Sequence, residues 1–125
     1  MLLALCACTS LPRGAPLGGC EPRTVEWLHF GLRTPTGVVS DAQWHAFLDR
    51  EISTRFPEGL TVLRADGRWR AGDGTSVDEA SRVVELVHRD DAAARAAVRD
   101  IAARYRVEFA QESVLRVRQR GEACF

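Results

Sequence analysis

The segment VEWLHFGL, residues 25–32, decides the fold, because it is rich in residues that favour β-strands and is too short for a helix. Turn residues follow it at Thr34, Pro35 and Gly37. Side chains alternate between the two faces of a strand. One face carries Leu28, Phe30 and Leu32, and the other carries Val25, Trp27 and His29. The alternation therefore predicts a strand that is apolar, and buried, on both faces.

Helical and extended patterns alternate after this strand. Ser40 and Gln43 form a capping box at the start of a helix predicted over residues 40–56, which Pro57 and Gly59 end. A second helix begins at Asp90 or Asp91, with its apolar side chains at helical spacing. Three further strands are predicted at residues 60–65, 81–88 and 113–118.

The order of these elements predicts the fold class. The dipeptide Asp66-Gly67 indicates a turn into the short segment 68–70, which would add an extra hairpin after the second strand. The order β-α-β-β-α-β predicts a ferredoxin-like α+β sandwich, an antiparallel sheet with two helices on one face. Its strands should lie in the order 4-1-3-2.

Two cysteines lie just outside the ends of this sheet. The predicted topology brings the start of the first strand and the end of the last strand to one edge, next to Cys20 and Cys124. In an exported protein we expect them to form a disulfide, and two free thiols on the chain ends are the alternative. No Cys-x-x-Cys or His-rich spacing occurs, so we expect no metal site.

The second apolar face of the sheet has no helix to cover it. We expect a second copy of the chain to cover it, giving a homodimer that encloses a small-molecule pocket. Candidate catalytic residues there are His29, as an acid or base, and Arg116, which could hold a carboxylate. Candidate ligand-binding residues are Trp27 and Glu85. The structural alternative is that these side chains only pack an interface or form an ion pair.

Composition limits the function classes. The 125 residues suffice for one domain, and 17 basic residues balance 17 acidic ones, so we expect no nucleic-acid binding. The sequence lacks a P-loop and a dinucleotide fingerprint, so we expect no cofactor. Polar residues at Gln111, Glu112 and Ser113 are interpreted as turn residues, and Trp69 as packing or a contact for a protein partner.

The N-terminal residues resemble a bacterial export signal. Residues 1–8 are apolar and end in Leu5-Cys6-Ala7-Cys8, the pattern of a truncated lipoprotein signal with a lipobox, in which Cys8 would carry the lipid. Residues 9–22 are rich in Pro and Gly and suit a flexible spacer, and residues 23–125 form the domain. We therefore expect a lipid anchor to the membrane of the bacterial cell envelope. A hydrophobic N-terminus without an export role is the alternative.

Several segments resemble a family of small bacterial proteins known as domain of unknown function 3574. They are Phe30-Gly31-Leu32, Val39-Ser40-Asp41 with Trp44 and Phe47, RFPEGLTV at 55–62, Gly67 with Trp69, and QESVLRV at 111–117. The resemblance implies a secreted protein or lipoprotein and supplies no activity or catalytic residue. Two classes of function remain: a lipoprotein domain that binds a small ligand or a protein, and a small cofactor-independent enzyme, isomerase-like or monooxygenase-like, with its site in a dimeric barrel.

Overall fold

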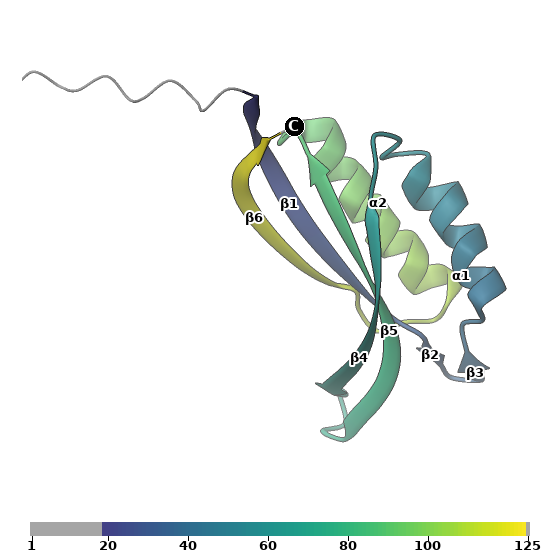
Figure 1. Cartoon of the computed structure of the whole chain (residues 1–125). Coiled ribbons are helices and arrows are strands. Elements are labelled where there is room, and N and C mark those ends of the chain that lie inside the picture. Colours follow the sequence, from purple (N-terminus) through teal and green to yellow (C-terminus); the bar gives the residue numbers. More distant parts are fainter. Residues whose placement is uncertain (1–18, 125) are drawn as a thin grey trace, which may run out of the picture.

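The structure is a computed structural model that describes residues 19–124. Two helical segments cover one face of a four-stranded antiparallel sheet, and the other face is open (Figure 1). The elements, in chain order, are β1 Cys20–Gly31, β2 Arg33–Thr34, β3 Gly37–Val38, α1 Asp41–Phe47, η1 Leu48–Ser53, β4 Thr61–Arg70, β5 Ser76–His88, α2 Ala92–Glu108 and β6 Leu115–Cys124. The sheet order is β4-β5-β1-β6, which confirms the predicted order and the ferredoxin-like α+β class.

The core forms where β1 meets the two helices. Leu28 and Phe30 have no exposed surface, as the alternation of β1 predicts. The Phe30 ring packs against Trp44 of α1 at 5.3 Å and against Tyr105 of α2 at 4.7 Å, measured between ring centroids. The Tyr105 hydroxyl donates a hydrogen bond of 2.8 Å to the carbonyl of Gly31 at the end of β1. Both helices are thereby fixed to the central strand.

The first helix begins as predicted and ends differently. Ser40 accepts a hydrogen bond from the Gln43 amide, and its own amide donates to the Gln43 side chain, which confirms the capping box. After Phe47 the chain widens into η1, a π-helix, and regular helical structure stops at Ser53 rather than residue 56. Pro57 lacks an amide hydrogen and disfavours helical backbone at the residue before it, so the helix ends ahead of it.

The extra hairpin after the second strand is a wrong prediction. β4 runs straight through Asp66 and Gly67, which pair with Ala80 and Glu79 of β5. The reversal comes later, where the Asp73 side chain accepts a hydrogen bond from the Thr75 amide and Gly74 adopts a φ of 87°. The result is one long β4–β5 hairpin whose tip projects beyond the helices (Figure 1).

The two ends of the sheet are also longer than predicted. β1 begins at Cys20, inside the segment that we assigned to the spacer, and β6 continues to Cys124. Cys20 pairs with Cys124 across the two strands, and a disulfide joins them, as predicted. The strands extend because each supplies the other with a partner for its backbone groups. Cys8 and the lipobox lie outside the described residues.

Candidate ligand-binding site

The sheet face without helices carries an unusual number of apolar side chains. We call it the open face, and its members are Val25, Trp27 and His29 of β1, Leu63, Gly67 and Trp69 of β4, Glu79, Ser81, Val83, Glu85 and Val87 of β5, and Leu115 and Val117 of β6. Leu63 and Leu115 are more than half exposed, at 51% and 58%. No helix within residues 19–124 covers these apolar side chains.

Three of the four predicted site residues lie on the open face. Trp27 is opposite Glu85 in the ladder, and its indole Nε1 donates a hydrogen bond of 2.7 Å to Glu85 Oε2. His29 follows Trp27 on the same face, one pleat further along β1. Trp27, His29 and Glu85 therefore share this face, but of the three only His29 lines the pocket described below, and their roles stay predictions.

The placement of Arg116 with them is wrong. Arg116 of β6 is opposite Leu28, whose side chain is buried under the helices. Its neighbours in β6, Leu115 and Val117, are opposite His29 and Trp27 instead. Since side chains alternate along a strand, Arg116 lies on the helix side of the sheet and cannot share a site with His29.

A cavity of about 240 Å³ opens on this face at the end of β1, and we call it the Gly31 pocket. Gly31 and Gly67 leave space there because they have no side chains, and their partners in the ladders are Ser81 and Glu79. Its lining residues are His29, Gly31, Gly67, Arg68, Trp69, Glu79, Ser81, Gln111, Glu112, Ser113 and Leu115. The pocket thus combines strands β1, β4 and β5 with the loop that leads into β6.

Glu79 is held rigidly at the centre of this pocket. Its Oε1 accepts a hydrogen bond of 2.7 Å from the indole of Trp69, and its Oε2 accepts one of 2.9 Å from the backbone amide of Arg33. A Cβ atom at Gly31 would lie only 2.6 Å from Glu79 Oε1, so a larger residue at this position would displace the carboxylate from its present place.

Two residues of the pocket, Trp69 and Glu79, were not among the predicted site residues. Trp69 and Glu79 lie on two different strands and meet only because β4 continues past Gly67, where a turn was predicted. Gln111, interpreted as a turn residue, does cap the turn, since its side chain donates to the carbonyls of Arg33 and Phe109. Gly31, Gly67 with Trp69, and residues 111–113 belong to the segments that resemble the family and all reach the pocket.

A family model for "Protein of unknown function (DUF3574)" matches residues 26–125, which is most of the chain. The chain belongs to this family. The match confirms the resemblance drawn from the sequence, and the family description assigns no activity. No curated protein matches the sequence of this DUF3574 domain.

Solved structures with a similar fold include two of a phage SAM lyase, one in the apo state and one in complex with S-methyl-5'-thioadenosine. Each has a TM-score of 0.61 and 17% sequence identity, and the alignment covers 93% of this chain and 97% of the lyase chain. At this identity the likeness shows that the DUF3574 domain shares the fold over nearly its whole length.

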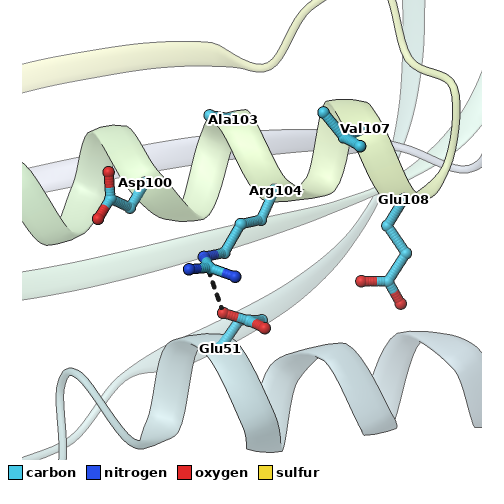
Figure 2. A pocket seen from close by; sticks show the side chains of 6 residues that line it. All are labelled: Glu51, Asp100, Ala103, Arg104, Val107 and Glu108. Carbon is cyan, nitrogen blue, oxygen red and sulfur yellow. Dashed lines mark ion pairs between the residues drawn. The ribbon is translucent and has the colours of Figure 1, made fainter.

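A second, shallow hollow lies between η1 and α2, where an ion pair between Glu51 and Arg104 joins the two elements (Figure 2). Glu51 is buried there and forms ion pairs with Arg55 at 2.7 Å and with Arg104 at 3.4 Å. Burial raises the pKa of the Glu51 carboxyl, but hydrogen bonds from Arg50 and Arg55 outweigh it and hold the pKa below its usual range. Since Glu51 and Glu108 each pair with arginines here, we interpret this hollow as a structural connection between the helices.

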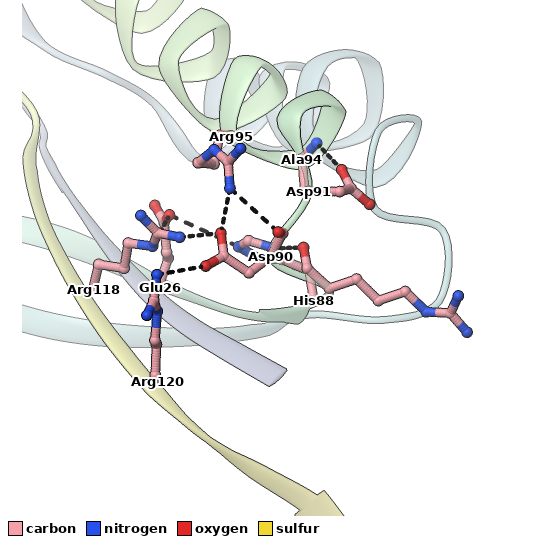
Figure 3. A network of polar contacts seen from close by, with 9 residues as sticks. Glu26, His88, Asp90, Asp91, Ala94, Arg95, Arg118 and Arg120 are labelled. Atoms are coloured by element: carbon pink, nitrogen blue, oxygen red, sulfur yellow. Dashed lines mark hydrogen bonds and ion pairs between the residues drawn. The ribbon is translucent and has the colours of Figure 1, made fainter. Parts of the chain in front are cut away.

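A polar network lies under the first turn of α2 (Figure 3). Asp90 forms ion pairs with Arg95 at 2.7 Å, with Arg120 at 3.3 Å and with Arg118. The hydrogen bond from Arg95 is the main cause of the lowered pKa of Asp90. The buried Glu26 of β1 lies 3.6 Å from Arg118 and 3.8 Å from His88. The network connects β6, which buries little apolar surface, to the rest of the DUF3574 domain.

Among residues 19–124, no cluster of His, Cys, Asp and Glu side chains has the arrangement of a metal site. None of the helices in that part of the chain is long and apolar enough to span a membrane. The side chains that line the Gly31 pocket include one imidazole, one indole ring and the carboxylates of Glu79 and Glu112.

Proposed function

We propose that this protein is a lipoprotein of the bacterial cell envelope whose DUF3574 domain binds a small molecule in the Gly31 pocket. The observation that carries the proposal is the pocket itself: small residues form its floor, while His29, Trp69 and Glu79 surround it with groups suited to a polar ligand with a ring. Its volume of about 240 Å³ is below the roughly 300–1,000 Å³ of drug-sized sites. A ligand of fragment size fits it best.

A second copy of the chain is the cover that we propose for the open face. Four strands about 4.8 Å apart, with roughly nine residues each at about 3.3 Å per residue, give a face of about 570 Å². Two such faces would bury about 1,100 Å² in total, which passes the roughly 1,000 Å² expected of a specific interface.

The oligomeric state is tested by light scattering on the full chain with Cys6→Ser and Cys8→Ser, which prevents lipid attachment. We expect twice the chain mass of 13.8 kDa, and we expect Trp27→Glu to dissociate the dimer. Val107→Glu is the matched control, because Val107 is 85% exposed on α2, away from the open face. A monomeric wild-type chain at micromolar concentration would rule out this cover and leave the open pocket to be tested by itself.

Export is supported by the Cys20–Cys124 disulfide, since such bonds persist mainly in oxidising compartments. The lipid anchor is tested by growing cells with a radiolabelled fatty acid. We expect label in the full-length protein and none in the Cys8→Ser variant. The Cys6→Ser variant should keep the label, and equal labelling of all three proteins would refute the assignment of Cys8.

A cofactor-independent enzyme is the second candidate, and the fold shared with a phage SAM lyase over 93% of the chain favours it. In this candidate His29 serves as the acid or base, because it is the only imidazole that lines the Gly31 pocket. The test incubates the full, oxidised chain with S-adenosylmethionine and measures the appearance of S-methyl-5'-thioadenosine. Product that disappears in His29→Ala would support this candidate, and no product above the buffer control would refute lyase activity.

A further inference from the structure

The charges around the Gly31 pocket do not cancel. The guanidinium of Arg68 is engaged by Asp78, with Nε 2.5 Å from Oδ1 and Nη2 3.2 Å from Oδ2. Glu79 and Glu112 also line the pocket, and neither forms an ion pair with any residue between 19 and 124. The pocket thus has two carboxylates without an ion-pair partner among residues 19–124, since its arginine, Arg68, is paired with Asp78.

The carboxylate of Glu79 is hydrogen-bonded but has no ion-pair partner among residues 19–124. Both of its hydrogen bonds come from neutral donors, the Trp69 indole and the Arg33 backbone amide. These bonds fix the orientation of the carboxylate but do not neutralise it, and each oxygen keeps a free lone pair. A positively charged ligand group would therefore meet a preorganised partner.

The ring of Trp69 adds a second attraction for a cation. It forms part of the same pocket, beside Glu79, and stays about one-third exposed, at 36%. The electron-rich face of an indole attracts ammonium and other organic cations, and tryptophan is the strongest of the aromatic side chains in this respect. An aromatic wall next to an unneutralised carboxylate is a combination that disfavours anions.

From this arrangement we infer that the Gly31 pocket selects a small organic cation, an amine or an alkylated onium group attached to a ring or another apolar group. The inference rests on the proposed ligand-binding function and specifies the class of ligand. The cationic group contacts Glu79 and Trp69, and the apolar part lies over Gly67 and against Leu115, which is 58% exposed on the open face.

The test compares three probes with the same ring and different charge: benzyltrimethylammonium, benzyl alcohol and benzoate. Their dissociation constants for the full, oxidised chain are measured by ligand-observed NMR at low and high salt. We expect the cation to bind three- to tenfold more tightly than benzyl alcohol at low salt, with the difference shrinking as salt rises. Benzoate should bind most weakly.

Two matched variants locate the effect. Glu79→Gln keeps an oxygen to accept from the Trp69 indole but removes the charge, so the preference for the cation should disappear. Glu85→Gln makes the same change at the other indole-bonded carboxylate of the open face, outside the pocket, and should keep the preference. Binding of all three probes with equal affinity, or an effect of Glu85→Gln equal to that of Glu79→Gln, would overturn the inference alone. Absence of saturable binding by every probe would overturn the proposed pocket as well.

Discussion

Removal of the disulfide between Cys20 and Cys124 should cost a large part of the stability of this domain. The two cysteines are 104 residues apart in the sequence, so the bond closes nearly the whole described chain into one loop. In the chain-entropy model a loop of roughly 100 residues restricts the unfolded chain by about 4.7 kcal/mol, and measured losses for native disulfides are about 2–5 kcal/mol. The free energy of unfolding of native domains is about 5–15 kcal/mol. The bond therefore supplies about a third of that free energy.

The assay is urea unfolding of the double variant Cys20→Ser/Cys124→Ser and of its parent, both carrying Cys6→Ser and Cys8→Ser so that no other thiol takes part. Tryptophan fluorescence and far-ultraviolet circular dichroism report the transition. We expect a loss of about 3–5 kcal/mol in the free energy of unfolding and a steeper dependence on urea, because the unfolded chain expands once the loop is open.

The expected loss of stability comes from the greater freedom of the unfolded chain rather than from native contacts near the bond. Nearly every residue of β6 is exposed, so little apolar burial is at stake near the bond. A loss below about 1 kcal/mol with an unchanged urea slope would mean that opening the loop does not expand the unfolded state. A large loss that 1 mM reductant on the parent does not reproduce would point to the serines rather than to the bond.

The other predictions concern the core and the pH limits. Phe30→Ala should lower the free energy of unfolding by about 3–5 kcal/mol, because it removes a fully buried ring, while Val107→Ala should change it by less than about 0.5 kcal/mol; urea unfolding measures both. Burial raises the pKa of Tyr105, the only tyrosine, so its phenolate absorbance should appear only on unfolding, and stability should fall as the pH rises above the ordinary tyrosine pKa of about 10. The hydrogen bond from Arg95 lowers the pKa of Asp90, so Asp90 stabilises the fold above the ordinary aspartate pKa of roughly 4 and loses this effect as the pH falls further; the unfolding midpoint of Asp90→Asn should depend less on pH in that range.

Most of the fold could be predicted because local signals agreed with the global arrangement. The apolar alternation around Phe30, the capping box at Ser40 and the cysteines at both ends of the sheet each indicated the same topology, and the structure confirms all three. The turn at Asp66-Gly67 failed because glycine also fits an extended strand. The chain turns around Gly74 instead, because this segment supplies both a side-chain hydrogen bond and a positive φ.

The candidate site was predicted only in part, because the local sequence of one strand does not determine its register against a distant strand. Trp27 and His29 share a strand, so their common face follows from alternation alone. Arg116 required the register of β6 against β1, and a shift of one residue moves every side chain to the other face. The contact between Glu79 and Trp69 required the true length of the β4–β5 hairpin.

The pairing of Cys20 with Cys124 also gives the molecule a direction. Both ends of the described chain leave from one end of the sheet, while Gly31 closes β1 at the other, about 36 Å away for 11 residues of strand (Figure 1). A tether ahead of Cys20 would hold the molecule by the end that is remote from the pocket. The Gly31 pocket would then lie at the far end of the molecule from the attachment surface, in a single chain and in the proposed dimer alike.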